Sequence, residues 1–400
     1  MPRNAIFFLN NYNDVDQTAP LILNLLQDAK GVKVVCLSDY QLTQDPRIQL
    51  FDGYPSFVIA TPKLFSRLTQ SPRKILKLVK RILFNTLFGI FFLKHHQIGI
   101  CMYTWCDPTG KGFQTAVFRA AQFLGIKNIC LPHGQNIFLN YDVNAYLKDF
   151  HEAKGTWPDF SPRNQFDLYI VQSKHHRNWN MHWGMDPAVI VSLGSLRFNP
   201  EWVEEHRTLY KDYENEQFEK FSDRVRLVFF IPHWHYNVDY EAAISLIAEL
   251  VESKLAVSVI KGHTRGHGIA QADFSDLSRH LCIHIDSNTP STPLIDWADV
   301  VINFGSSIGL EAIVKDRTVI NPRFLHENRT VFDNSGAVYD AFSNGDVLEI
   351  LRQFRNAELP KIDRHARKRL LNSEIFNGYF GSSSVEQYRA IYDRYLVGRS

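Results

Sequence analysis

The chain has 400 residues, more than one hydrophobic core usually supports, so two domains are expected. Basic and acidic side chains nearly balance at a formal net charge of +2, which gives no indication of a nucleic-acid partner. Five scattered cysteines lack the spacing of a disulfide framework or a zinc site, which suits a reducing cytoplasm. The apolar run near the N-terminus is too short for a signal peptide.

Short apolar runs alternate with helical patterns through the first half of the chain. The runs predict buried strands at 5–9, 32–37, 57–60, 98–103, 128–131, 168–171 and 188–193. Helices are predicted at 21–26, 113–124 and 173–183, and Asn10 to Asp14 is expected to be a polar loop. This alternation predicts a parallel sheet, in which the loops after the strands carry ligands.

The stretch 73–93 differs in character from the rest of this half. One face of its predicted helix carries the basic residues Arg73, Lys77, Lys80 and Arg81. The uncharged, Phe-rich run that follows is shorter than the about 20 apolar residues of a membrane span. A basic amphipathic helix with an aromatic flank predicts contact with an anionic membrane surface. The alternative is a core-facing helix with a solvated basic edge.

Two strand ends in the first half carry candidate site residues. The strand ending at Leu131 runs into His133, Gly134 and Gln135. A His at a strand end, followed by Gly, lies where the backbone can approach a ligand closely, and it is in the position of a general base. A single His is more often structural, and that alternative stays open. The strand near 188–193 leads to a Gly-Ser-Leu-Arg run that ends at Arg197.

The second half begins after a charged and aromatic stretch at 200–223, where we expect the domain linkage. Strands are predicted at 226–231, 257–260, 283–285, 298–302 and 318–321, and helices at 240–252, 293–297, 347–354 and 384–396. Three strand ends carry polar groups: His233 with His235, Lys261 with His263 and Arg265, and Ser306 with Ser307. Because the carboxyl ends of parallel strands meet along one edge, these loops are expected to face one crevice.

The run from Asn303 to Ala312 predicts a strand end, a tight turn at Gly305 and a helix. The first N–H groups of such a helix and its dipole favour a bound phosphate. Ser306 or Ser307 can cap the helix or donate to a phosphate oxygen, and Glu311 shares the helix face of Ser307, where it can accept from ribose hydroxyls. An ordinary capped helix in an α/β core is the alternative.

The order of these motifs resembles that of the GT-B glycosyltransferases. The run 301–312 resembles the strand end and Gly-x-Glu-Ala helix of bacterial capsule-type Kdo transferases. Three further runs, at 232–235, 261–264 and 306–307, are similar to the Pro-Thr-Trp-Arg, Lys-Pro-His-Pro and Ser-Ser signatures of teichoic-acid (CDP-glycerol) glycerophosphotransferases. Both families have a His-Gly like His133-Gly134. The resemblance covers roughly 95–335, and the sequence departs from the glycerophosphotransferase pattern at Leu196, His235, Gly262 and Thr264.

The resemblance implies an α/β GT-B fold: two Rossmann-like domains whose parallel sheets face a central crevice. It implies an acceptor domain over 1–198, a nucleotide-donor domain over 199–380 and a closing helix over 381–400 that packs back on the first domain. It further implies a metal-independent enzyme without a cofactor, in which the donor is itself the nucleotide-bearing substrate. Asp14 and Asp16 have the spacing of the metal-binding motif of the other glycosyltransferase class, and we expect them to be surface charge.

The same resemblance implies roles for the candidate residues. The donor-binding set is His233, His235, Lys261, Arg265, Gly305, Ser306, Ser307 and Glu311. The catalytic set is His133, His263 and Asp239, of which His133 would activate the acceptor hydroxyl and His263 would neutralise donor phosphate. Asp239 is a carboxylate for a covalent intermediate or else an acid at a helix N-terminus. Gly134, Gln135 and Arg197 are expected to line the crevice or contact the acceptor.

Three functions stay open on the sequence. The first is a transferase of lipopolysaccharide O-antigen or capsule synthesis, which moves a sugar such as Kdo from a cytidine-nucleotide donor to a glycan or lipid-linked acceptor. The second is a polyol-phosphate transferase, and the third is a non-catalytic, membrane-attached assembly subunit. Glu311 favours the first and the Pro-x-Trp-x strand end favours the second, whereas turnover of any donor would exclude the third. The expected location is the cytoplasm, with peripheral attachment to the inner face of the membrane.

Overall fold

A computed structural model of the chain describes residues 4–28, 33–37, 42–60, 86–110, 112–140, 145–210, 224–231, 238–262, 282–285, 290–379 and 383–397. The chain forms two compact units. Unit 1 comprises 1–134, 158–209 and 373–400, and unit 2 comprises 135–157 and 210–372. The division therefore differs from the expected one at 198/199 and 380/381, because the chain also makes an early excursion into unit 2 over 135–157.

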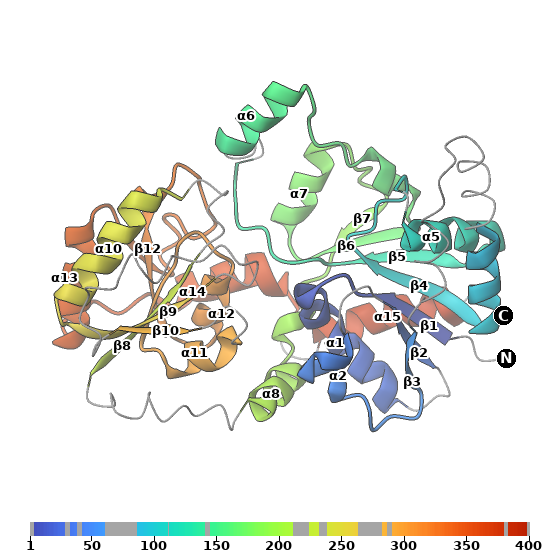
Figure 1. Cartoon of the computed structure of the whole chain (residues 1–400), viewed down its shortest axis with the longest axis horizontal. Coiled ribbons are helices and arrows are strands. Elements are labelled where there is room, and N and C mark those ends of the chain that lie inside the picture. The colour runs from blue at the N-terminus through green and yellow to red at the C-terminus, as the bar shows by residue number, and fades with distance from the viewer. Residues whose placement is uncertain are drawn as a thin grey trace, which may run out of the picture. The chain divides into compact units, whose positions relative to one another are not determined.

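Unit 1 is built on a parallel sheet of seven strands in the order β3-β2-β1-β4-β5-β6-β7 (Figure 1). Its strands are β1 (Asn4–Phe8), β2 (Val34–Leu37), β3 (Phe57–Ala60), β4 (Ile98–Thr104), β5 (Lys127–Leu131), β6 (Leu168–Val171) and β7 (Ile190–Ser192). The predicted strands are confirmed, with ends shifted by one or two residues. The strand order reverses between β1 and β4, and open α/β sheets bind ligands outside such a switch point.

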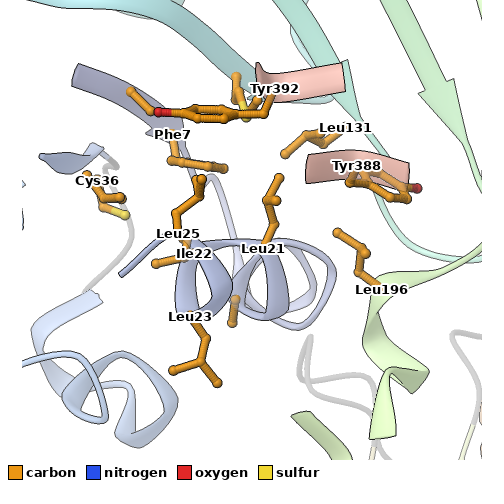
Figure 2. Packing of buried hydrophobic residues seen from close by; sticks show 14 of the residues in the cluster. Phe7, Leu21, Ile22, Leu23, Leu25, Cys36, Leu131, Leu196, Tyr388 and Tyr392 are labelled. Carbon is orange, nitrogen blue, oxygen red and sulfur yellow. The ribbon is translucent and has the colours of Figure 1, made fainter. Parts of the chain in front are cut away.

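Helices cover both faces of this sheet because side chains along a buried strand alternate between the two faces. Ala5 and Phe7 point to the core under α1 (Tyr12–Gln27) and α15 (Ser383–Val397). Figure 2 shows Phe7, Leu25 and Tyr392 gathered in this core. Ile6 and Phe8 point to the opposite core, under α5 (Phe113–Leu124), α7 (Lys174–His182) and the helix at 86–95. The shorter helical pieces of unit 1 are η1 (Leu42–Gln44), α2 (Pro46–Gln49), η2 (Ser161–Gln165), η3 (Leu196–Phe198) and α8 (Pro200–Leu209).

The expected polar loop at 10–14 is wrong, because α1 already begins at Tyr12. The Asn11 side chain accepts from the backbone N–H groups of Asn13 and Asp14 at 2.9 and 3.3 Å, and the Asp14 carboxylate accepts from Asn11 N at 3.2 Å. This reciprocal capping box starts the helix within a polar run. The expectation that Asp14 and Asp16 are surface charge is also wrong: they are 0% and 5% exposed, on the side of α1 that packs against the rest of unit 1.

Unit 2 contains a second parallel sheet, of six strands in the order β10-β9-β8-β11-β12-β13. Its strands are β8 (Val225–Phe230), β9 (Ala256–Lys261), β10 (Cys282–Ile285), β11 (Val300–Ile302), β12 (Thr318–Pro322) and β13 (Tyr339–Ala341). The helices α10 (Tyr240–Glu252) and α13 (Asn344–Arg355) share one core with the sheet. The other helical pieces are α11 (Ser291–Trp297), α12 (Ile308–Val314), η6 (Arg323–Leu325) and α14 (Arg364–Leu371). This sheet reverses its order between β8 and β11, so each unit has its own switch point.

The early excursion adds a strap to unit 2. Phe138 and Thr330 form an antiparallel bridge, Leu139 N donates to Arg329 O at 2.8 Å, and α6 (Ala145–Lys154) follows. The chain returns to unit 1 after α14, through the π-helical turn η7 (Asn372–Phe376). Gly194 makes room for this return: a Cβ there would lie 2.9 Å from the carbonyl oxygens of Ile375 and Phe376. In the described part of the chain, no helix is long and apolar enough to cross a membrane.

Candidate functional site

The candidate residues lie at the carboxyl ends of the two sheets, beside the switch points, and each unit is described by itself. His133, Gly134 and Arg197 belong to unit 1. The described candidates of unit 2 are Gln135, Asp239, Lys261, Gly305, Ser306, Ser307 and Glu311. The remaining candidates, His233, His235, His263 and Arg265, lie outside the described residues, as do Arg73, Lys77, Lys80 and Arg81.

In unit 1 the structure pairs His133 with a buried carboxylate that the sequence did not assign to it. His133 Nδ1 lies 2.5 Å from Asp14 Oδ1, and Asp14 Oδ2 accepts from Asn10 N at 2.7 Å and from Asn11 N. Asp14 is therefore fixed on both oxygens. Because a carboxylate accepts the proton of Nδ1, the neutral ring keeps its lone pair on Nε2. The His133 side chain is 23% exposed, so this buried pair reaches the surface through the imidazole.

The loops around this pair belong to strands on either side of the switch point. Asn10 follows β1, and its Nδ2 donates to Thr104 O, at the end of β4, at 2.8 Å. The next residue, Trp105, has a φ of +47° and is 47% exposed, and its ring centroid lies 5.4 Å from that of His133. A bulky residue in the left-handed region is strained, and such strain is concentrated at functional sites.

Trp105 is supported from one side by Arg163. The guanidinium carbon of Arg163 lies 4.0 Å from the centroid of the Trp105 ring and 3.5 Å from that of Phe160. The result is a half-exposed indole beside the His133–Asp14 pair, which forms an apolar wall of the kind on which a sugar ring can stack. Sequence reasoning missed both Asp14 and Trp105. The available signals were the Asn-x-x-Asp capping spacing of 11–14 and the position of Trp105 directly after a buried strand.

Arg197 lies in a buried ionic cluster centred on Asp16. Asp16 Oδ1 accepts from Arg47 at 2.6 Å, Arg47 also pairs with Asp45 at 2.6 Å, and Arg197 Nε lies 3.7 Å from Asp16 Oδ2. Burial by itself would raise the pKa of Asp16, but Arg47, with Arg197 and His206, holds it below its usual value. The cluster ties α1, α2 and η3 together and fixes the direction of Arg197.

The candidate phosphate turn of unit 2 follows β11. Gly305 has a φ of +72°, Ser306 N donates to Asn303 Oδ1 at 3.0 Å, and Ile308 N donates to Ser306 Oγ at 3.4 Å. Ser306, rather than Ser307, therefore makes the side-chain bond at the start of α12; within the described residues, Ser307 makes no such bond.

His326 lies against this turn. A Cβ at residue 305 would lie 3.0 Å from His326 Nε2, so only glycine leaves room for the imidazole. His326 Nδ1 lies 3.1 Å from Asn328 O, and burial lowers the pKa of the ring, which keeps it neutral. Among the described residues, the buried His326 Nε2 and Asn303 Nδ2 have no hydrogen-bond partner. Two unsatisfied buried polar atoms beside one turn are typical of a site that a ligand completes.

The other described candidates of unit 2 have identifiable partners. Glu311 is buried and accepts from Thr292 Oγ1 at 2.8 Å, whereas Lys261 is buried at the end of β9 and donates to Gly262 O at 3.3 Å. Asp239 accepts from Ala242 N at 3.0 Å and so caps α10, which is the helix-terminal role that the sequence left open. In the described ranges, no group of three or more His, Cys, Asp or Glu side chains could hold a metal ion.

Comparison with known proteins places the fold. No protein-family model matches the sequence, and no curated protein matches it. Among solved structures, a UDP-N-acetylglucosamine 2-epimerase matches with a TM-score of 0.63 at 13% identity, over 100% of this chain and 98% of that one. The enzyme of the same name from Neisseria meningitidis, bound to UDP-GlcNAc, matches with a TM-score of 0.62 at 14% identity, over 98% of this chain and 100% of that one.

A third match is a UDP-glucosyltransferase from Polygonum tinctorium, with a TM-score of 0.54 at 10% identity, over 100% of this chain and 99% of that one. Two parallel α/β units with doubly wound sheets, together with these matches, identify the GT-B fold. The predicted fold class is thereby confirmed. At these identities the likeness concerns the fold alone, so the finer resemblance to Kdo transferases and glycerophosphotransferases stays a prediction.

Proposed function

We propose that the chain is a metal-independent glycosyltransferase of bacterial surface polysaccharide synthesis, which uses a nucleotide-activated donor. The observation that carries this proposal is the His133–Asp14 pair at the switch point of unit 1. Transfer to a hydroxyl requires a group that accepts the hydroxyl proton, and an imidazole oriented by a buried carboxylate is suited to that role.

On the acceptor side, His133 Nε2 takes the proton as the acceptor oxygen bonds to the transferred group. Asp14 stabilises the imidazolium that forms, because its carboxylate remains bonded to Nδ1. The exposed part of the Trp105 ring gives the acceptor sugar an apolar surface beside the base. Gly134, Gln135 and Arg197 are the further candidate acceptor contacts.

On the donor side, the bond between the transferred group and the phosphate breaks, and negative charge develops on that phosphate. The turn at Gly305, Ser306 and Ser307 provides N–H and hydroxyl donors for it, with Lys261 as a cation from the neighbouring strand end β9. The sequence adds His233, His235, His263 and Arg265 to the donor set. We assign Glu311 to the ribose, where its carboxylate would accept from a hydroxyl in place of Thr292.

The cytidine base of the donor follows from the family resemblance. The UDP-bound and UDP-GlcNAc-bound neighbours make uridine the alternative. Thermal unfolding of the purified protein with CMP, CDP, UMP, UDP or AMP tests the assignment, because a ligand that binds the native state raises Tm. We expect CMP or CDP to raise Tm most and AMP to leave it unchanged. A larger rise with the uridine nucleotides would overturn the cytidine assignment, and no rise with any nucleotide would overturn the donor site.

A further inference from the structure

The helix at 86–95 is held on α5 by one face. A Cβ at Gly89 would lie 2.9 Å from Ala120 Cβ and 3.0 Å from Ala116 O, so the two helices approach closely at this glycine. The rings of Phe88 and Phe92 contact Phe113 at centroid distances of 5.9 and 5.6 Å. This inner face is fully used by packing within unit 1, on the side of the sheet that α5 covers (Figure 1).

The outer face of the same helix carries large apolar side chains. Leu87 and Phe91 are one turn apart and 62% and 66% exposed, and Phe123, near the end of α5, is 77% exposed. Single exposed apolar residues are normal on protein surfaces. Two on one face of a helix, with a third on the helix that it packs against, indicate an interaction surface. We call Leu87, Phe91 and Phe123 the apolar face.

The sequence around the apolar face has one sign of charge. Between Asp52 and Asp107 the chain contains eight Lys or Arg residues and no acidic residue, and one of the eight, Lys94, is exposed on the helix itself. The whole chain has an excess of only two basic side chains, so the remainder is net acidic. A positively charged region that also exposes aromatic and aliphatic side chains complements a surface that is anionic outside and apolar beneath.

We infer that the apolar face docks unit 1 on an anionic lipid bilayer. Leu87 and Phe91 enter the boundary between headgroups and acyl chains, and Lys94 with the other basic residues of this acid-free region contacts the headgroups. The helix lies in the plane of the interface and does not span the membrane, because its inner face stays packed on α5. This inference does not depend on the proposed donor or on catalysis.

Co-sedimentation with lipid vesicles tests this inference. The full chain is mixed with vesicles of pure phosphatidylcholine or with vesicles that contain phosphatidylglycerol, at low and high salt. We expect the wild type to bind the anionic vesicles, to bind less at high salt as charges are screened, and to bind phosphatidylcholine weakly. The double variant L87S/F91S is expected to bind about tenfold less. F342S is the matched control, because Phe342 is 63% exposed in unit 2, and it should bind like the wild type.

Further readings separate the outcomes. Lys94→Glu leaves the apolar face intact and is expected to weaken binding to anionic vesicles while unfolding at the same temperature as the wild type. Binding of L87S/F91S at the wild-type level, or no binding of the wild type at low salt, would overturn the inference. A wild type that dimerises in sedimentation velocity and ignores vesicles would show that a second copy covers this face, which also overturns it. Stabilisation by nucleotide, measured on the same variants, should not change and so reports separately on the donor site.

Discussion

His133 depends on Asp14 for the direction of its ring, because the 2.5 Å contact at Nδ1 decides which nitrogen faces the acceptor. Asp14→Asn offers an amide N–H to Nδ1 and so favours the wrong tautomer. We expect a loss of about 10²–10⁴ in the transfer rate with little change in donor affinity, and a similar loss for His133→Gln. Steady-state and single-turnover kinetics give both values. Because the two residues act as one unit, the double variant should be little worse than the poorer single variant.

The control for this pair separates catalysis from folding. Asp14 also accepts from Asn10 N and Asn11 N at the start of α1, so its replacement perturbs the helix cap. Asn11→Ala removes the other half of the capping box and leaves the Asp14–His133 contact in place. It should lower the free energy of unfolding by about 1 kcal/mol and keep the transfer rate. A transfer rate in Asn11→Ala as low as in Asp14→Asn would mean that the pair acts only through stability.

At the scale of elements, the turn between β11 and α12 requires glycine at 305. Gly305→Ala places a Cβ 3.0 Å from His326 Nε2 at a φ of +72°, which costs about 1–2 kcal/mol and displaces the turn. Gly336→Ala is a matched control, because Gly336 has a φ of +68° and its Cβ would lie 3.3 Å from Ala366 Cβ. We expect both variants to unfold more easily but only Gly305→Ala to lose nucleotide affinity in a titration. Equal affinities would remove this turn from the donor site.

The start of α7 contains a buried histidine that makes unit 1 sensitive to acid. Ser173 Oγ lies 2.9 Å from His176 Nδ1, and burial lowers the pKa of His176 from 6.5 to about 3. The unfolded chain therefore binds this proton first, so stability falls as the pH drops below 6.5 and continues to fall towards pH 3. At pH 5 the loss is about 2 kcal/mol.

Urea unfolding at pH 7 and pH 5 measures this loss. His176→Gln cannot take up a proton and should lose about 2 kcal/mol less than the wild type between the two pH values. The buried Glu374 contacts the same Ser173 Oγ, and burial raises its pKa, so it acts in the opposite direction in both proteins. An identical pH dependence in wild type and variant would contradict the buried, neutral state of His176.

The elements also show what local sequence can predict. Apolar runs bounded by turns predicted the long strands, because burial on both faces leaves a continuous apolar pattern. The edge strand β13 (Tyr339–Ala341) is only three residues long and lacks such a pattern, and it was missed. The start of α1 was missed because a capping box has a polar sequence. The strap of Phe138 on Thr330 pairs residues far apart in the chain, which no local pattern specifies.

The candidate site divides in the same way. A strand-end position was enough to select His133 and the turn at Gly305, because parallel strands deliver their loops to one edge. The partnership of His133 with Asp14 depends on the order β1-β4-β5, which brings the loops after β1 and β5 together around the end of β4. Strand order is a property of the whole sheet, so neither Asp14 nor the contact of His326 with Gly305 was accessible from spacing alone.

At the scale of the whole molecule, the chain repeats one plan. Each unit is a doubly wound sheet with polar groups beyond its switch point: a base in unit 1 and an anion-binding turn in unit 2. Epimerases and a glucosyltransferase share this fold, so the fold does not decide between rearranging a nucleotide sugar and transferring its glycosyl group. The proposed function makes the distinction through His133, which deprotonates an external hydroxyl.

The most direct measurement follows radiolabel from the donor. The wild type and His133→Gln are incubated with labelled CMP-Kdo, CDP-glycerol or UDP-GlcNAc and a lipid extract that contains glycan acceptors. We predict that the wild type transfers label from CMP-Kdo to the glycan fraction and releases CMP, and that His133→Gln reduces this transfer by about 10²–10⁴. Label that moves from CDP-glycerol instead would indicate a polyol-phosphate transferase. Conversion of UDP-GlcNAc to its epimer without transfer, or no turnover of any donor, would contradict the proposed glycosyltransferase activity.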